Sequence, residues 1–437
     1  MQILMLSSTF PYPPSRGGTQ VRTFNLLKYL SQRHSITLAT QHQKDVTPAE
    51  IEELRQYVTE LAVFLRPATP IFPQTGNLVA GIKRRWGKFS RFSQFLRTGT
   101  PPHVFSTYSI AMQQWVDAWI QAGNCEVITC EHSINEIYVR PEWQQQVRTV
   151  VNVHSSVYGT CRQLLATGTS ENPLRDRLNL PLLHRYEQRY CAKFSRIVVT
   201  TEEDRRQLQA LLSATQQQRR NSLVVSQLLP STSEPTTRFP IDVIPNGVDL
   251  VAFPARSLDP GGHRLIFAGA MDNLPNIDAV RFLSLEVLPV LQQRYADTTL
   301  TLVGANPTPE IQALASRPGI QVTGRVPRVV DYLHQATVCV IPMRIGFGIK
   351  NKTLEAMAAG TPVVASDRAL EGLAVDSPGQ PLQALRANLI QEYVEAISYL
   401  FESESLRQEL SRNARSLIES EYTWDVQGKR YETILLH

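Results

Sequence analysis

The stretch GFGIKNKTLEAMAAGTPVVAS, residues 346–366, decides how this sequence folds. The apolar run TVCVIPM (337–343) before it predicts a strand, KNKTLEAMAAG (350–360) predicts a helix, and TPVVAS (361–366) predicts a second strand. A strand, a helix and a strand in this order form the crossover unit of a parallel sheet. We therefore expect this part of the chain to be an α/β domain.

The same alternation of short apolar runs and helix-length segments continues outward along the chain. Further strands are predicted at QILMLSS, SITLAT, LAVFL, EVITC, TVVNV and RIVVT in the first half and at RLIFAGA, TLTLVGA and IQVTGRV in the second. Helices are predicted near 385–402, 405–420 and 424–436, and the Gln-, Ser-, Thr- and Pro-rich span 213–240 is predicted to be an exposed insertion. We expect an α/β fold of two doubly wound domains facing a cleft, with ligands at the carboxyl ends of the strands.

The composition narrows the class of protein. The 437 residues are 42% hydrophobic, which is enough for two domains with their own cores. The five cysteines are widely spaced without a C-x-x-C pair, so we expect buried thiols in a reducing compartment. The N-terminus lacks the pattern of a signal peptide, and no apolar run reaches the roughly 18 residues of a membrane span. A cytoplasmic protein, either soluble or on a membrane surface, is expected.

Charge is unevenly distributed along the chain. Residues 1–244 hold 27 Lys+Arg and 18 Asp+Glu (+9), whereas residues 245–437 hold 17 and 21 (−4). A basic first half indicates an anionic partner, such as a membrane surface or a nucleic acid.

The loop before the helix at residue 350 has the chemistry of a phosphate site. Gly346 and Gly348 allow backbone N–H groups to approach a ligand, and a helix N-terminus favours an anion. The cations near this helix start are Arg344, Lys350 and Lys352. Because cations there oppose the helix dipole, we expect a compensating anion, and a nucleotide diphosphate fits. Glu355 could accept both hydroxyls of a ribose; the alternative is an ordinary amphipathic helix with a solvated charged face.

This segment resembles the donor-binding motif of the GT-B retaining glycosyltransferases of family 4, whose usual pattern is Glu-x7-Glu followed by Ala-Met-Ala-x-Gly-x-Pro-Val-Val. Glu355 matches the second Glu, which binds the ribose in that family, but Phe347 stands where the first Glu contacts the sugar. A subgroup with G-x-G-x-x-x-K-x-L-E is matched through Gly346, Gly348, Lys352, Leu354 and Glu355. The resemblance implies a GT-B fold of two Rossmann-like domains and a donor loop that includes Phe347 and Asn351.

The resemblance extends over nearly the whole chain. The Gly pair Gly17 and Gly18 resembles the family's first loop, which lies near the diphosphate and the acceptor. VTGRV (322–326) resembles the loop that holds the base, with Arg325 nearby. His154 stands where family members carry a His that contacts the donor sugar. Ala270 and Asn276 replace an Arg and a Lys that grip the β-phosphate in typical members. We place the acceptor domain at 1–241 and the donor domain at 242–420, and in this fold the last helix (421–437) packs back on the first domain.

The reaction implied by the resemblance is transfer of a hexose, with retention, from a nucleotide-diphosphate sugar, with a UDP-sugar favoured. No carboxylate pair stands out as nucleophile and acid. A front-side path, in which the departing phosphate helps to deprotonate the acceptor, requires electrostatic stabilisation of that phosphate. His154, Lys352 and Glu355 are the predicted catalytic residues. The sequence has no credible Asp-x-Asp, so we expect neither a metal nor a cofactor besides the donor.

The segment GIKRRWGKFSRFSQFLR (81–97) is the candidate membrane-facing region. Six Lys or Arg residues alternate with aromatic ones, as in helices that lie on anionic bilayers. The candidate residues are Lys83, Arg84, Arg85, Trp86, Lys88 and Phe89. The alternative is a core-packed helix with a solvated basic face; no nucleic-acid recognition motif accompanies the segment, so a nucleic-acid partner is not expected.

The basic, aromatic-rich first domain favours a membrane lipid or lipid-linked acceptor, as in glycolipid or galactolipid synthesis, with the enzyme peripheral on the cytoplasmic face of a membrane. An exopolysaccharide or other cell-surface glycan transferase with a soluble or polymeric acceptor is the alternative enzyme. Because the first Glu is missing, a non-catalytic sugar-nucleotide-binding protein is a further alternative.

Overall fold

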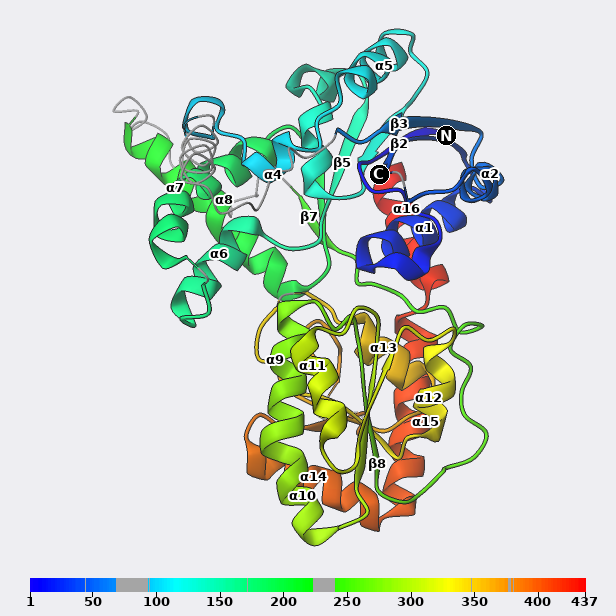
Figure 1. The fold of residues 1–437 in the computed structure, drawn as a ribbon. Coiled ribbons are helices and arrows are strands. Elements are labelled where there is room, and N and C mark those ends of the chain that lie inside the picture. Colours follow the sequence, from blue (N-terminus) through cyan, green and yellow to red (C-terminus); the bar gives the residue numbers. More distant parts are fainter. Residues whose placement is uncertain are drawn as a thin grey trace, which may run out of the picture. The chain divides into compact units, whose positions relative to one another are not determined.

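The computed structural model describes residues 1–43, 45–67, 93, 95–170, 172–222, 240–346, 348–375, 379 and 381–437. The chain divides into two compact units (Figure 1). Unit 1 comprises Met1–Ile244 and Gly428–His437, and unit 2 comprises Pro245–Gln427. Each unit has its own buried apolar core. The five cysteines are all buried and free.

Unit 1 is built on a seven-stranded parallel sheet in the order β3-β2-β1-β4-β5-β6-β7. The strands are β1 (Gln2–Ser7), β2 (Ser35–His42), β3 (Glu60–Leu65), β4 (Val127–Cys130), β5 (Arg148–Val153), β6 (Arg196–Val199) and β7 (Ile241–Val243). The α-helices are α1 (Gly18–Leu30), α2 (Pro48–Arg55), α4 (Pro102–Phe105), α5 (Ile110–Gln121), α6 (Val157–Ala166), α7 (Pro173–Cys191), α8 (Glu202–Ser222) and the end of α16 (Trp424–Leu436). The central strands are nearly continuous apolar runs because a parallel sheet is buried on both faces.

Unit 2 is built on a six-stranded parallel sheet in the order β10-β9-β8-β11-β12-β13. Its strands are β8 (Arg264–Ala268), β9 (Thr299–Val303), β10 (Ile320–Gly324), β11 (Val338–Ile341), β12 (Val363–Ala365) and β13 (Leu385–Arg386). Its α-helices are α9 (Leu274–Phe282), α10 (Leu288–Arg294), α11 (Pro309–Ala313), α12 (Val329–Gln335), α13 (Asn351–Ala358), α14 (Ile390–Glu402) and α15 (Glu404–Glu421). Figure 1 shows α9, α10 and α11 on one face of this sheet and α12, α13 and α15 on the other.

The strand order locates the sites of such sheets. In unit 1 the order reverses between β1 and β4, and in unit 2 it reverses between β8 and β11. Ligands of doubly wound sheets bind outside the carboxyl ends of the strands at this reversal. Ligands are therefore expected at the loops after β8 and β11 and at those after β1 and β4.

The predicted architecture of two parallel-sheet α/β domains is confirmed, and the predicted strands all occur. Two details of the prediction are wrong. Residues 385–386 form β13, so the helix predicted from residue 385 begins at Ile390. Residues 213–222 continue helix α8, because Gln, Arg and Ala favour helix, while residues 223–239 of the predicted insertion lie outside the described residues.

The last helix joins unit 1 through Gly428, which lies against the ring of Tyr29 on α1. A Cβ atom on Gly428 would lie 2.2 Å from that ring. One turn on, Glu432 accepts hydrogen bonds from His34 Nε2 at 2.7 Å and from the Tyr29 hydroxyl at 3.4 Å. This contact requires a glycine and fixes the end of the chain on α1.

Gly428→Ala is expected to lower the free energy of unfolding by about 1–3 kcal/mol, as overpacking of a close contact does. The sign of the effect tests the contact, because Gly→Ala at an unconstrained position inside a helix would instead stabilise the protein by about 1 kcal/mol. Thermal unfolding of Gly428→Ala, Tyr29→Ala and the double variant measures the effect. The double variant should cost less than the sum of the two single changes; strict additivity would contradict the assigned contact.

Candidate active site

The loop between β11 and α13 contains two glycines with positive φ values. Gly346 and Gly348 have φ values of 102° and 72°, a region that favours glycine. Lys350 is the N-cap residue of α13, and in the described part of the chain no side chain caps the first turn of this helix. A helix start without a side-chain cap can receive an anion at its first N–H groups. Phe347 lies outside the described residues.

Lys352 and Glu355 lie one turn apart on α13, beside the strand reversal of unit 2. The Lys352 ammonium lies 4.4 Å from the centre of the Phe267 ring and donates a hydrogen bond to Asn276 Oδ1. Burial, reinforced by the charge of Lys350, lowers the pKa of Lys352 to about 7. Burial raises the pKa of Glu355 to about 7, against the opposing effect of Lys352. Perturbed ionisable pairs of this kind are frequent at functional sites.

Two glycines at strand ends bring backbone close to this pair. A Cβ atom on Gly269, after β8, would lie 2.8 Å from Lys352 Nζ and 2.9 Å from Asn276 Nδ2. A Cβ atom on Gly304, after β9, would lie 1.7 Å from the Gly269 carbonyl oxygen. The backbone at these strand ends therefore packs closely against one side of the ammonium group.

Asn276, to which the sequence assigned no role of its own, contacts Lys352 in the structure. Its Nδ2 donates to the Ala270 carbonyl oxygen at 2.8 Å, which leaves Oδ1 facing Lys352. The signal in the sequence was that Asn276 stands where typical members of the resembled family have a Lys. A neutral amide here holds the cation of α13 in place and does not add a second cation.

Two other predicted cations of unit 2, Arg344 and Lys350, are already engaged by acidic residues. Arg344 forms an ion pair with Asp278 on α9, at 2.5 Å, and its guanidinium lies 5.0 Å from the centre of the Phe282 ring. The Lys350 ammonium lies 4.0 Å from Glu371 and donates to the Gly348 carbonyl oxygen. Carboxylates of the protein thus neutralise part of the positive charge at the start of α13, which the sequence had indicated a bound anion would neutralise.

Two further predicted residues take their places around the same sheet edge. Asn351 is half-buried and accepts a hydrogen bond from Asn246 Nδ2 at 2.8 Å, which ties the start of α13 to the chain entering unit 2. Arg325 follows β10 directly and is exposed.

His154 follows β5 in unit 1 and lies beside a second imidazole. Its ring contacts that of His132, which follows β4, edge to face with centroids 4.9 Å apart. Nε2 of His154 is buried and has no hydrogen-bond partner among the described residues. Burial lowers the pKa of His132 to about 4 and that of His154 well below its usual value, so both rings are neutral at pH 7. A neutral ring nitrogen without a partner is suited to a ligand hydroxyl.

A buried polar network lies next to His154. Asn152 accepts from Arg22 at 3.2 Å and donates to the Tyr431 hydroxyl at 2.7 Å, and that hydroxyl donates to Glu131 at 3.2 Å. All four side chains are almost completely buried. The network connects α1, two strand ends and the last helix, and no local pattern in the sequence predicts it. Gly18 is the first residue of α1, four residues before Arg22, and Gly17 is its N-cap residue in an extended conformation.

The membrane-facing candidates Lys83, Arg84, Arg85, Trp86, Lys88 and Phe89 lie outside the described residues. Within the part of the chain that the structure describes, no helix combines the length and the apolar character that crossing a bilayer requires.

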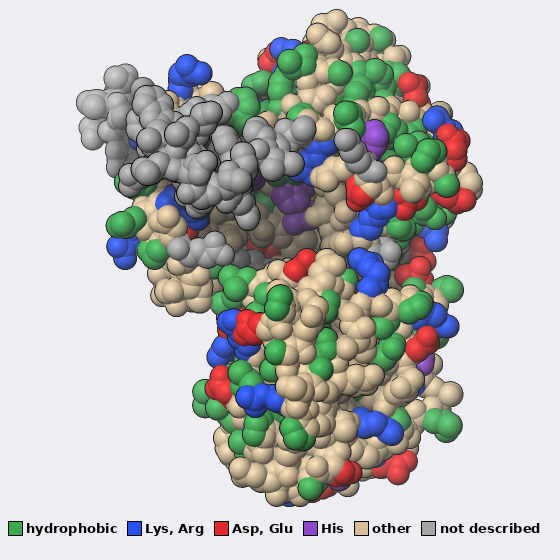
Figure 2. All heavy atoms as spheres, viewed as in Figure 1, with side chains coloured by type: hydrophobic (Ala, Val, Ile, Leu, Met, Phe, Trp, Pro, Cys, Tyr) green, Lys and Arg blue, Asp and Glu red, His purple; other side chains and the backbone are tan. Residues whose placement is uncertain are grey.

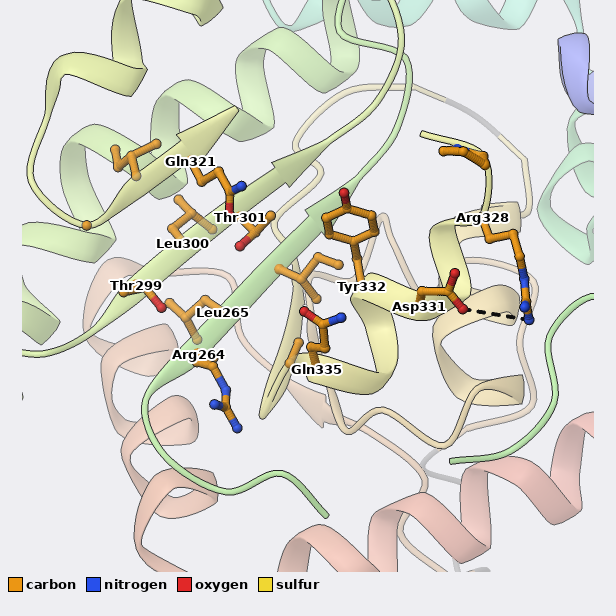
Figure 3. Close-up of a pocket in the computed structure, with 15 residues that line it drawn as sticks. Arg264, Leu265, Thr299, Leu300, Thr301, Gln321, Arg328, Asp331, Tyr332 and Gln335 are labelled. Atoms are coloured by element: carbon orange, nitrogen blue, oxygen red, sulfur yellow. Dashed lines mark ion pairs between the residues drawn. The ribbon is translucent and has the colours of Figure 1, made fainter. Parts of the chain in front are cut away.

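A pocket of about 790 Å³ opens elsewhere on unit 2 (Figure 3). It lies against the starts of β8, β9 and β10 and against α12, and it includes none of the predicted donor residues. Thr299, Thr301 and Gln321 line the sheet side, and Tyr332 and the Arg328–Asp331 pair line the helix side. Because strand starts lie at the opposite edge from the reversal loops, this pocket is separate from the candidate site.

Comparison with known proteins shows the family of each domain and the fold. Residues 16–217 match the model of Glycosyltransferase Family 4, and residues 262–403 match that of Glycosyl transferases group 1. No protein with a curated description matches the chain by sequence.

Solved structures share the fold over the full chain. Anabaena Alr3699/HepE in complex with UDP is 13% identical, with a TM-score of 0.61 over 100% of this chain and 99% of that chain. TarM is 11% identical, with a TM-score of 0.62 over 99% of this chain and 98% of that chain. A glycosyltransferase from Rickettsia africae is 11% identical, with a TM-score of 0.57 over 99% of this chain and 97% of that chain. The chain thus consists of a family 4 glycosyltransferase domain followed by a group 1 glycosyltransferase domain, on the two-unit GT-B fold.

Proposed function

We propose that the protein transfers a hexose, with retention, from a nucleotide-diphosphate sugar, and that a UDP-sugar is the donor. The observation that carries the proposal is the half-buried Lys352–Glu355 pair behind the glycine loop at the reversal of the unit 2 sheet. A cation and a carboxylate one helical turn apart match the diphosphate and the ribose of such a donor. The HepE structures with UDP, and with UDP-glucose, are examples of this fold binding that class of ligand.

The proposed roles follow from the placement of the residues. The diphosphate lies at the start of α13, against the N–H groups of the loop from Gly346 to Asn351 and the Lys352 ammonium. Glu355 accepts the ribose hydroxyls, and Arg325 lies near the base. Lys350 and Arg344 attract the diphosphate more weakly, because the ion pairs with Glu371 and Asp278 partly neutralise their positive charges.

In unit 1 we assign His154 to a hydroxyl of the transferring sugar, because its Nε2 lacks a partner. Gly17 and Gly18 give the backbone of α1 access to the donor and the acceptor. As the bond to the anomeric carbon breaks, the departing phosphate accepts the proton of the attacking acceptor hydroxyl. Lys352 stabilises the charge that develops on that phosphate.

We further propose a membrane lipid or lipid-linked acceptor, with the enzyme on the cytoplasmic face of a membrane, because the first half of the chain is basic and carries the aromatic-rich segment 81–97. The test is donor hydrolysis with a panel of UDP- and GDP-sugars, followed by transfer to total membrane lipid with product identification by mass spectrometry. Sugar transferred from UDP to a lipid product supports the proposal. Transfer only to a soluble glycan would refute the acceptor, and binding without turnover would indicate a non-catalytic protein.

Activity is expected to be the same within about twofold with and without a chelator. The proposed site neutralises the leaving phosphate with Lys352 and helix N–H groups, so no divalent cation is needed for that task. Initial rates measured in EDTA and in Mg²⁺ provide the comparison. Loss of activity in EDTA that Mg²⁺ restores would contradict metal-independent transfer.

A further inference from the structure

Helix α7 of unit 1 carries an unusual pair of exposed leucines. Leu174 and Leu178 expose 74% and 63% of their surface and lie four residues apart, on one face of the helix. Among the described helices of unit 1, no other exposes two large apolar side chains. Single exposed leucines are common, whereas two leucines four residues apart on one helix form a small contiguous apolar patch.

The charges of α7 are sorted between its two sides. At about 100° per residue, Leu174, Leu178, Pro181 and Arg185 form one stripe within about 60°, and Arg177 and Arg189 lie on either side of it. All six are exposed. The helix's two carboxylates, Asp176 and Glu187, fall on the opposite side and are buried.

The buried carboxylates are held inside the unit by their own partners. Asp176 accepts hydrogen bonds from Ser170 at 2.7 Å and from Arg175 at 2.8 Å. Glu187 accepts from Ser156 Oγ at 2.6 Å and from the Val157 N–H at 2.7 Å, at the start of α6. The exposed side of α7 therefore presents leucines among arginines, without an acidic residue of its own.

The helix is also well anchored behind this face. Arg189 donates to the Thr98 carbonyl oxygen and to the Thr100 hydroxyl, each at 2.7 Å, and Tyr186 and Tyr190 are buried in the core of unit 1. Figure 2, viewed as Figure 1, shows apolar and basic side chains next to one another at the end of unit 1 where α6, α7 and α8 lie. The face is thus a fixed surface.

We propose that this outward face of α7, made of Leu174, Arg177, Leu178, Pro181 and Arg185, rests on an anionic lipid bilayer. Guanidinium groups pair with lipid phosphates in a bidentate manner, and the leucines enter the boundary between head groups and acyl chains. The apolar area is small, so attachment requires both the charges and the leucines. The inference rests on the proposed function, because it gives a transferase that acts on membrane lipid its place of contact with the bilayer.

The test is flotation of the full-length protein with vesicles of phosphatidylcholine, with and without phosphatidylglycerol. The two test variants are Leu174→Ser/Leu178→Ser and Arg177→Gln/Arg185→Gln. We expect binding to the anionic vesicles only, at low salt. The arginine pair should weaken it about 25-fold, at about fivefold per charge, and the leucine pair at least about tenfold, at about fourfold per buried methylene group.

The control is Val251→Ser/Leu258→Ser, which removes two apolar residues of unit 2 that are more exposed than the leucines of α7, at 89% and 80%, and should bind like the wild type. The inference would be overturned if both α7 variants bound like the wild type or if the control lost binding to the same extent. It would also be overturned if the wild type bound neutral vesicles or did not bind vesicles at all. If only Lys83, Arg84, Arg85 and Lys88→Glu abolishes binding, the segment 81–97 is the contact and α7 is not. Hydrolysis of UDP-sugar in solution by the same variants tests the transferase separately, since α7 holds none of the donor residues.

Discussion

Glu355→Ala is expected to weaken donor binding about 100-fold, because a carboxylate that accepts two ribose hydroxyls contributes roughly 3 kcal/mol. The side chain is partly buried on α13, and burial has already raised its pKa to about 7. The carboxylate form is therefore lost as the pH falls below about 7, and wild-type affinity should decline on the acid side. The affinity of the Glu355→Ala variant should not show this decline at low pH. Isothermal calorimetry with UDP-sugar at several pH values measures both effects.

The control for this prediction is Glu395→Ala on α14, an exposed glutamate of the same unit. Glu355→Gln should fall between wild type and alanine, because the amide still accepts one hydrogen bond but carries no charge. Melting temperatures of all variants separate loss of binding from loss of fold. Donor affinity of Glu355→Ala equal to that of the control would remove Glu355 from the site.

The fold was predictable because its signals are local. Each strand is a short apolar run, and the glycine loop with its helix lies within one stretch of about twenty residues, so hydrophobic period and turn residues suffice to place them. Where local signals conflict, the prediction was wrong. The Gln- and Arg-rich residues 213–222 resemble a linker in composition but are good helix formers, and they extend α8.

The contacts of the candidate site were predictable only where both residues lie in one short segment. Lys352, Glu355 and the glycines share the α13 segment, whereas Asn276 reaches Lys352 across 76 positions and Tyr431 reaches Asn152 across 279. Such contacts depend on which strand ends the topology brings together, which a single sequence does not specify. The same holds for charge: the pairing of Arg344 with Asp278 appears only when α9 lies beside the loop after β11.

Lys352→Met is expected to lower donor affinity about 10³-fold and to reduce turnover by a similar factor. The change truncates one partner of a buried charge contact, which costs roughly 2–5 kcal/mol, and the lost ammonium also stabilises the leaving phosphate. Methionine keeps the length and the apolar stem, so the packing against Phe267 is preserved. Calorimetry with UDP and with UDP-sugar, together with single-turnover rates, separates binding from chemistry. Lys429→Met, at an exposed position of α16, is the control.

The pH dependence distinguishes a charge effect from a packing effect. The pKa of Lys352 is lowered to about 7 in the free protein, and a bound diphosphate must raise it. Binding above about pH 7 therefore takes up a proton, and wild-type affinity should fall about tenfold per pH unit on that side. Lys352→Met should lose this alkaline limb. Asn276→Asp places a carboxylate where the amide oxygen now accepts a hydrogen bond from the Lys352 ammonium. The carboxylate should raise the pKa of Lys352, so the loss of affinity should begin at a higher pH. The same carboxylate should also compete with the diphosphate for the ammonium. An unmoved limb in Asn276→Asp would mean that another group titrates there.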